Sequence, residues 1–106
     1  MRTLSGIQPS GQMHIGNYFG MARQMLDLQE HGDVFLFIAN YHALTSLTDG
    51  QQLRENVLDV AVNLLSFGLD LEKTTFWVQS DVPEVLELYW FLSNFTPMGL
   101  KLERNQ

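Results

Sequence analysis

The side chains best suited to chemistry lie in a glycine-rich stretch near the start of the chain, between Gly6 and Gly20. Within it, His14 and Asn17 stand on either side of Gly16, where a helical pattern of apolar residues begins. Free N–H groups at the start of a helix, together with the helix dipole, favour a bound phosphate. Both side chains can also donate hydrogen bonds to such a group. The stretch therefore predicts a phosphate-binding loop that leads into a helix.

This loop follows neither of the two best-known phosphate-binding patterns. Its glycines at 6, 11 and 16 do not form G-x-G-x-x-G, and no G-K-[ST] follows them. Glycines also permit tight backbone packing, so a plain turn between a strand and a helix is an alternative. The spacing alone predicts a ligand at this turn without identifying it.

Short apolar segments alternate with helical patterns along the rest of the chain. The predicted strands are 3–5, 34–39 and 74–79, and the predicted helices are about 16–31, 50–67 and 82–95, with a further helix start in 98–106. This order predicts an α/β fold, a Rossmann-like parallel sheet with flanking helices. The continuous apolar run 34–39 is typical of a strand that is covered on both faces.

Capping residues predict where the second and third helices begin and end. Asp49 and Gln52 resemble a capping box at the start of the second helix, and Gly68 is a typical stop signal. Asp81 is expected to cap the third helix, with Pro83 in its first turn.

Apolar residues on these two helices predict which faces are buried. The expected stripe of the second helix consists of Leu53, Val57, Leu58, Ala61, Leu64 and Leu65. The expected apolar face of the third helix consists of Val85, Leu88, Tyr89 and Leu92. Trp77 and Trp90 are expected in the core. Aromatic residues nevertheless occur on more than one face of the third helix, at Tyr89, Trp90, Phe91 and Phe95, so part of it is expected to stay exposed as a partner site.

Composition limits the possible partners. The chain has 106 residues, 45% hydrophobic and 17% charged, which predicts at most one globular domain. Its formal net charge is −6, and its six Lys and Arg residues include no adjacent pair. Nonspecific nucleic-acid binding needs clustered positive charge, so an acidic chain of this kind is expected to bind nucleic acid poorly.

Targeting and metal-binding signals are also informative. There are no cysteines, so disulfides and thiolate metal sites are excluded. No His, Asp or Glu cluster has the spacing of metal ligands, and no metal site is expected. The start of the chain has no apolar core of a signal peptide, and no apolar run is long enough to span a membrane. We therefore expect a cytoplasmic protein.

Residues 5–20 resemble the first signature of class I aminoacyl-tRNA synthetases, in the form found in the bacterial-type tryptophanyl branch. The "HIGH" motif of that class corresponds to residues 14–17, His-Ile-Gly-Asn, preceded by S-G-I-Q-P-S-G at 5–11 and followed by Y-F-G at 18–20. Further similar blocks lie at 42–45, 68–70 and 78–84. The tyrosyl enzymes are the nearest relatives of this branch, and they are the main alternative within the class.

The resemblance implies that ATP, accompanied by Mg²⁺, is a substrate. The ATP-binding residues that it implies are Gln8, Pro9, Ser10, Gly16 and Asn17. It also implies that His14 and Asn17 are catalytic. They would stabilise the charge that develops at the α-phosphate as pyrophosphate leaves, rather than transfer a proton.

L-tryptophan is the second implied substrate, and Leu4, Ile7 and His42 are the implied residues of its pocket. For each of them, a purely structural role is the alternative to ligand binding. An apolar residue near a strand, such as Leu4 or Ile7, is more often part of the core. A histidine at a strand end, such as His42, is often satisfied by a backbone hydrogen bond.

The implied reaction activates tryptophan to tryptophanyl-adenylate and then transfers it to tRNA. The resemblance further implies a single partial Rossmann-type catalytic domain over 1–106, with a nucleotide-binding half at 1–42. Residues 43–106 would belong to the connecting insertion that builds a homodimer interface in this family.

Two functional features of the family have no counterpart in these 106 residues. They are the lysine-rich "KMSKS" loop and the acidic residue that recognises the indole N–H. We therefore expect the chain alone to be inactive or very weak, and tRNA binding to depend on parts not present. A noncatalytic nucleotide-binding or dimerising module is the alternative from another class of function.

Overall fold

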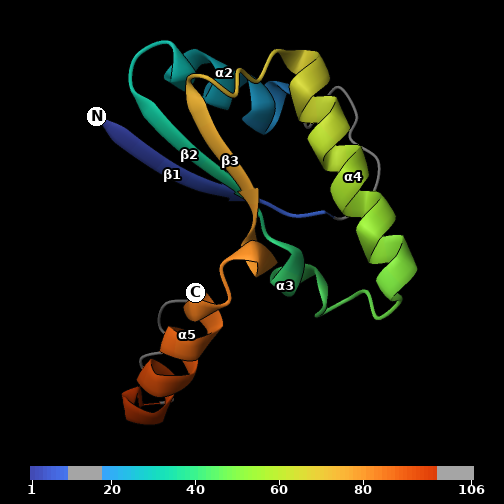
Figure 1. Cartoon of the computed structure of the whole chain (residues 1–106), viewed down its shortest axis with the longest axis vertical. Helices are drawn as coiled ribbons and strands as arrows, with labels where there is room; N and C mark the ends of the chain where they lie inside the picture. Colours follow the sequence, from blue (N-terminus) through green and yellow to red (C-terminus); the bar gives the residue numbers. More distant parts are fainter. Residues whose placement is uncertain (10–17, 98–106) are drawn as a thin grey trace.

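The structure, a computed structural model, describes residues 1–9 and 18–97 (Figure 1). Its strands are β1 (Arg2–Ile7), β2 (Asp33–Ile38) and β3 (Thr74–Val78). Its α-helices are α2 (Arg23–Gln29), α3 (Asn40–Ala43), α4 (Gly50–Phe67) and α5 (Glu84–Phe95), with a π-helical turn η1 (Tyr18–Ala22) before α2 and a 3₁₀ turn η2 (Gln79–Asp81) after β3. The predicted helix 16–31 is thus a π-helical turn followed by a shorter α-helix, and its first two residues lie outside the described ranges. The predicted further helix in 98–106 lies outside them too.

The three strands form one parallel sheet in the order β1-β2-β3. Ser5, Leu36 and Phe76 are aligned across it. The predicted α/β fold with a parallel sheet and flanking helices is therefore confirmed. The first strand is longer than its apolar residues indicate, since β1 begins at Arg2 and ends at Ile7.

The helices α2 and α4 cover one face of this sheet. Val34, Leu36 and Ile38 of β2 are buried on that face, in a core with Met25 of α2 and with Val60 of α4. Side chains alternate between the two faces of a strand.

The other face of β2 carries Phe35 and Phe37, which are half-exposed. Among the described residues, no helix layer covers this second face. The expectation that β2 is covered on both faces is therefore wrong for this part of the molecule. A continuous apolar run indicates that both faces of a strand are apolar. It does not show that the described part of the chain covers both of them.

The ends of α4 are as predicted. The Asp49 carboxylate accepts hydrogen bonds from the backbone N–H of Gln51 (2.9 Å) and of Gln52 (3.3 Å). Gly68 ends the helix with φ 111°, a left-handed conformation that favours glycine.

The buried stripe of α4 is rotated from the predicted one. Val60 and Leu64 are buried, whereas Leu58 and Leu65 are 65% and 44% exposed. α4 has apolar residues on two sides, and the sheet covers only one of these sides. Helical periodicity alone could not show which side would be buried.

A buried amide connects α2, α4 and β3. Gln29 donates from Nε2 to the carbonyl oxygen of Gly68 (3.1 Å). Its Oε1 accepts from the N–H of Asp70 (3.1 Å) and from Oγ1 of Thr74 (3.2 Å). At the surface nearby, Lys73 donates to Glu30 (2.8 Å), and this hydrogen bond raises the pKa of Lys73 above its usual 10.5.

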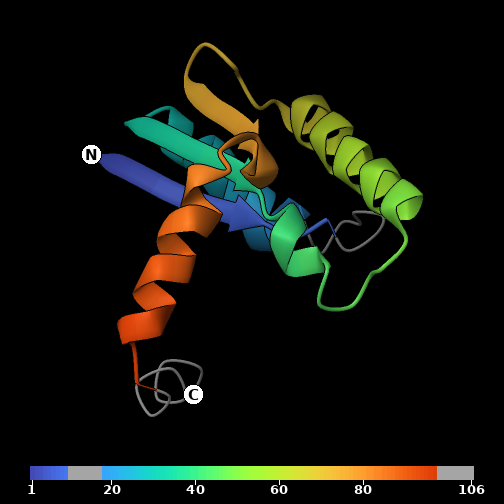
Figure 2. The ribbon, with the colours of Figure 1, turned by 60° about the horizontal axis from the view of Figure 1, so that its bottom comes forward.

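α5 differs from its prediction in how it begins and in what it buries. Pro83 occupies the cap position and no side chain caps the helix, so the prediction that Asp81 caps it is wrong. Asp81 is instead the last residue of the 3₁₀ turn η2, two positions before Pro83. In both views α5 extends away from α4 (Figures 1 and 2).

None of the described residues on α5 is buried. Trp90 is 66% exposed, so its predicted core position is also wrong, whereas Trp77 of β3 is half-buried. No helix in the described part of the chain combines the length and the apolarity needed to span a membrane.

Candidate functional site

The carboxyl ends of the three strands meet at one edge of the sheet, where open α/β sheets bind ligands. The N–H of Ala39, just after β2, donates to the carbonyl oxygen of Ile7 at the end of β1 (2.8 Å). Asn40 and Ser80 join the ends of β2 and β3 by two hydrogen bonds. Asn40 Nδ2 donates to Ser80 Oγ (2.9 Å), and Asn40 Oδ1 accepts from the Ser80 N–H (3.2 Å). These bonds hold the first residues beyond the strands in place.

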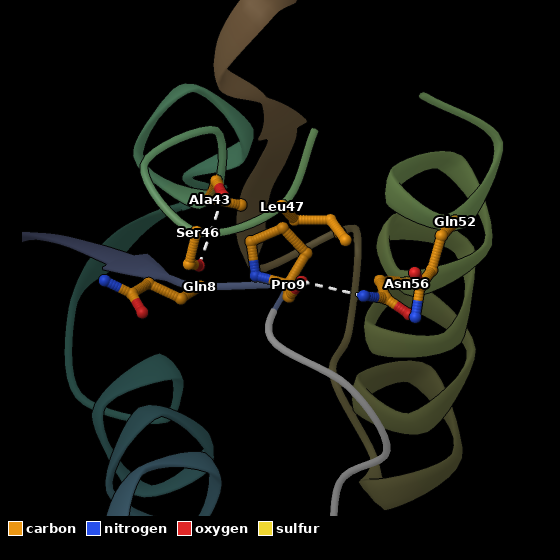
Figure 3. A pocket seen from close by; sticks show the side chains of 7 residues that line it. All are labelled: Gln8, Pro9, Ala43, Ser46, Leu47, Gln52 and Asn56. Carbon is orange, nitrogen blue, oxygen red and sulfur yellow. Dashed lines mark hydrogen bonds between the residues drawn. The ribbon is translucent and has the colours of Figure 1, made fainter. Parts of the chain in front are cut away.

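Gln8 and Pro9 leave this edge of the sheet and lead into the glycine-rich loop. Pro9 is fully buried, and its carbonyl oxygen accepts a hydrogen bond from Asn56 Nδ2 of α4 (3.3 Å) (Figure 3). Beside them lies a cavity of about 240 Å³, lined by Gln8, Pro9, Ala43, Ser46, Leu47, Gln52 and Asn56. The structure therefore brings two of the predicted ATP-binding residues, Gln8 and Pro9, to a partly polar cavity at the ligand-binding edge.

The remaining residues predicted for ATP lie outside the described residues. These are Ser10, His14, Gly16 and Asn17. Their assignment to ATP binding and catalysis stays a prediction from the sequence.

The three residues predicted for the amino-acid pocket do not share one face. Ile7 packs against the core beneath the helices. Leu4 points to the opposite, open face of β1 and is 69% exposed. Residues three apart on a strand point to opposite faces, which excludes a common pocket wall for Leu4 and Ile7. His42 is exposed on α3, just beyond β2. The structure thus supports the core interpretation for Ile7 and leaves Leu4 and His42 as candidates.

A second cavity lies on the open face beside Leu4. Its volume is about 200 Å³, and it is lined by Leu4, Phe37, Trp77, Gln79 and Val85. The rings of Phe37 and Trp77 are 5.6 Å apart. The Phe37 ring also covers Gly6, since a Cβ at Gly6 would lie 2.7 Å from the ring tip. This packing explains why a glycine is needed there.

Sequence reasoning missed two polar residues of these cavities. Gln79 has a buried Oε1 without a hydrogen-bond partner among the described residues. Asn56 lies one turn before the buried Val60, on the core side of α4. A polar residue in an apolar stripe was a signal that could have identified Asn56. In the described ranges, no three His, Asp or Glu side chains come together as metal ligands would.

Comparison with known proteins identifies the family. Residues 1–103 match the family model of class I tRNA synthetases (W and Y). The chain belongs to this family. The resemblance predicted from residues 5–20 is therefore confirmed, and it extends over nearly the whole chain.

The chain is similar to tryptophan–tRNA ligases of several bacteria. It is 62% identical to that of Campylobacter jejuni over 104 residues, which are 98% of this chain and 32% of the relative. It is 57% identical to that of Fusobacterium nucleatum over 103 residues, 97% of this chain and 31% of the relative. The chain spans about a third of the length of these relatives.

Solved structures agree with the fold. A Campylobacter jejuni tryptophanyl-tRNA synthetase complexed with ADP and tryptophan has a TM-score of 0.89 and 61% identity, covering 94% of this chain and 31% of that one. The enzyme from Mycoplasma pneumoniae has a TM-score of 0.84 and 36% identity, over 92% of this chain and 29% of that one. These values confirm the Rossmann-like arrangement of the sheet and its helices.

Proposed function

We propose that this chain supplies the nucleotide-binding part of a tryptophan–tRNA ligase. In the reaction, ATP and tryptophan form tryptophanyl-adenylate and pyrophosphate, and the tryptophanyl group then passes to the terminal ribose of tRNA. The observation that carries the proposal is the likeness to the Campylobacter jejuni enzyme. That enzyme is 61% identical in sequence, and its structure was solved with ADP and tryptophan.

On the nucleotide side, the proposal assigns Gln8, Pro9, Ser10, Gly16 and Asn17 to ATP binding, within a nucleotide-binding half at 1–42. Backbone N–H groups and the helix start would hold the phosphates, with Mg²⁺ bound to the ATP. His14 and Asn17 would stabilise the charge that develops as pyrophosphate leaves. The position of Gln8 and Pro9 in the lining of the cavity at the sheet edge supports this assignment.

On the amino-acid side, the proposal assigns Leu4 and His42 to the tryptophan pocket. Leu4 lies on the open sheet face beside an apolar cavity, which suits an aromatic side chain. Tryptophan is favoured over tyrosine by the S-G-I-Q-P-S-G stretch, by Asn17 and by the names of the relatives.

The proposal also includes a homodimer formed through residues 43–106, where α5 exposes its apolar side chains. tRNA would bind mainly through regions beyond these residues, because the chain itself is acidic. A protein with this activity is expected to work in the cytoplasm. A noncatalytic nucleotide-binding module is the competing function, and the same experiment distinguishes the two.

The test is a chimera in which this chain replaces the matching third of the Campylobacter jejuni enzyme. We expect ATP–pyrophosphate exchange that depends on tryptophan and not on tyrosine. We also expect Gly16→Val to reduce it at least about tenfold, because a side chain would obstruct the approach of the nucleotide. Exchange that is absent from a folded chimera, or that tyrosine supports equally, would contradict the proposal. The 106-residue chain alone should bind ATP weakly in a calorimetric titration.

A further inference from the structure

Asn56 is a polar residue on the side of α4 that faces the core. It lies four and eight residues before Val60 and Leu64, the two buried residues of this helix, so all three share one helical face. An apolar side chain at position 56 would continue the stripe. The amide instead uses a donor, and its partner lies 47 residues away in the sequence, at the carbonyl oxygen of Pro9 (3.3 Å).

Pro9 needs an external contact of this kind. The ladder between β1 and β2 ends at Ile7, whose carbonyl oxygen is already taken by the N–H of Ala39. Proline has no N–H, so its carbonyl is its one backbone group able to form a hydrogen bond. Its ring is buried beside Ala43 and Leu47, and Asn56 holds its carbonyl from the opposite side (Figure 3).

α4 is well suited to serve as the support for this contact. It is capped by Asp49 at one end and by Gly68 at the other, and its core face is packed on the sheet. A donor on such a helix has a defined position relative to the ends of the strands. By contrast, β1 ends at Ile7, so the strand itself does not fix the positions of Gln8 and Pro9.

We propose that Asn56 is a positioning residue of the nucleotide site, which fixes the position of Gln8 and Pro9 through the Pro9 carbonyl without touching ATP itself. The inference rests on the proposed function, because it assumes that these two residues contribute to ATP binding. It predicts that losing the donor weakens ATP binding and leaves tryptophan binding unchanged.

The test compares Asn56→Leu with Asn63→Leu in the exchange-active chimera. Asn63 lies on the same helix and is also half-buried, but its amide donates within α4, to the carbonyl oxygen of Asp59 (2.7 Å). We expect Asn56→Leu to raise the KM for ATP about threefold to tenfold, the range for one lost positioning hydrogen bond. The KM for tryptophan should stay within about twofold. Asn63→Leu should change neither constant.

Folding is checked separately. Asn56→Leu leaves the carbonyl of the buried Pro9 without its partner, so it is compared with Asn63→Leu well below the unfolding temperature of either variant, where circular dichroism should show both to be folded. Asn56→Asp, which keeps the shape and loses the donor, should raise the KM for ATP more than Asn63→Asp, which adds the same charge to the same helix. Unchanged ATP constants in both Asn56 variants, or an equal rise in the tryptophan constant, would overturn the inference. An inactive parent chimera would instead count against the proposed function.

Discussion

At the scale of single residues, Gln29 is the side chain in the described part of the chain with the most hydrogen bonds to distant segments. It is 8% exposed, and it forms three hydrogen bonds that join α2, the end of α4 and the start of β3. Buried polar groups are costly unless paired, and here the donor and the acceptor of the amide are both used. The contact between Asn56 and Pro9 is similar, with one half-buried amide joining two distant segments.

We therefore predict that Gln29→Leu lowers the free energy of unfolding by about 2–4 kcal/mol. Leucine fits the space, but it leaves the groups that contact Gln29 without their partner. The matched control is Gln24→Leu at an exposed position of the same helix, which should change stability by less than about 0.5 kcal/mol. Urea denaturation of the 106-residue chain measures both values. Equal stabilities of the two variants would refute the role assigned to Gln29.

At the scale of elements, local chemistry determines where α4 begins and ends, and packing determines which of its faces is buried. Its two ends are defined locally, by the carboxylate of Asp49 and by the left-handed conformation of Gly68. Its rotation about its own axis is set by the sheet, which covers Val60 and Leu64 and leaves Leu58 exposed. Among the described residues, no sheet or helix covers α5 in this way, so neither of its faces is buried.

The left-handed conformation of Gly68 leads to a second prediction. Gly68→Ala should lower the free energy of unfolding by about 1–2 kcal/mol, because φ 111° is strained for any residue with a Cβ. Gly50→Ala is the matched control at the other end of α4, where an added Cβ meets nothing within 4 Å. That variant should be neutral or slightly stabilising. The unfolding temperature should therefore fall for Gly68→Ala and stay the same or rise slightly for Gly50→Ala, and a loss of stability shared equally would contradict the explanation.

At the scale of the whole molecule, much apolar surface stays exposed in this part of the family fold. One sheet face carries Leu4, Phe35 and Phe37 without a helix layer among the described residues. The eight large apolar side chains of α5 are exposed as well, from Val85 to Phe95. Exposed apolar surface of this extent is typical of a partner site, and a two-fold dimer is the commonest assembly.

We predict that the 106-residue chain forms a dimer that Trp90→Asp or Phe91→Asp dissociates. Both side chains are about two-thirds exposed on α5, and a charge there would be buried at a cost on association. Val62→Asp is the control, since Val62 is 61% exposed on α4, away from the α5 side chains at which this interface is proposed. Sedimentation analysis distinguishes the outcomes. A monomer at high concentration, or polydisperse aggregates that none of the substitutions changes, would argue against this interface.

The sequence by itself determined the order of the elements, the parallel sheet, both ends of α4 and the family. These depend on periodicity and turn chemistry within a few residues, and on a signature at residues 5–20 that is continuous in the chain. It also placed Gln8 and Pro9 in the glycine-rich loop at the edge of the sheet. Each of these features can be recognised without knowing which segments meet in space.

Only the tertiary structure decided which faces are covered and which distant residues meet. Alternation along β1 separates Leu4 from Ile7, but the packing of α2 and α4 determines that Ile7 belongs to the core. Asn56 reaches Pro9 because the chain crosses from β2 back over the sheet, which brings together residues 47 positions apart. Contacts of this kind depend on the path of the whole chain, because a side chain's partner is set by where other segments run and not by its own neighbours in sequence.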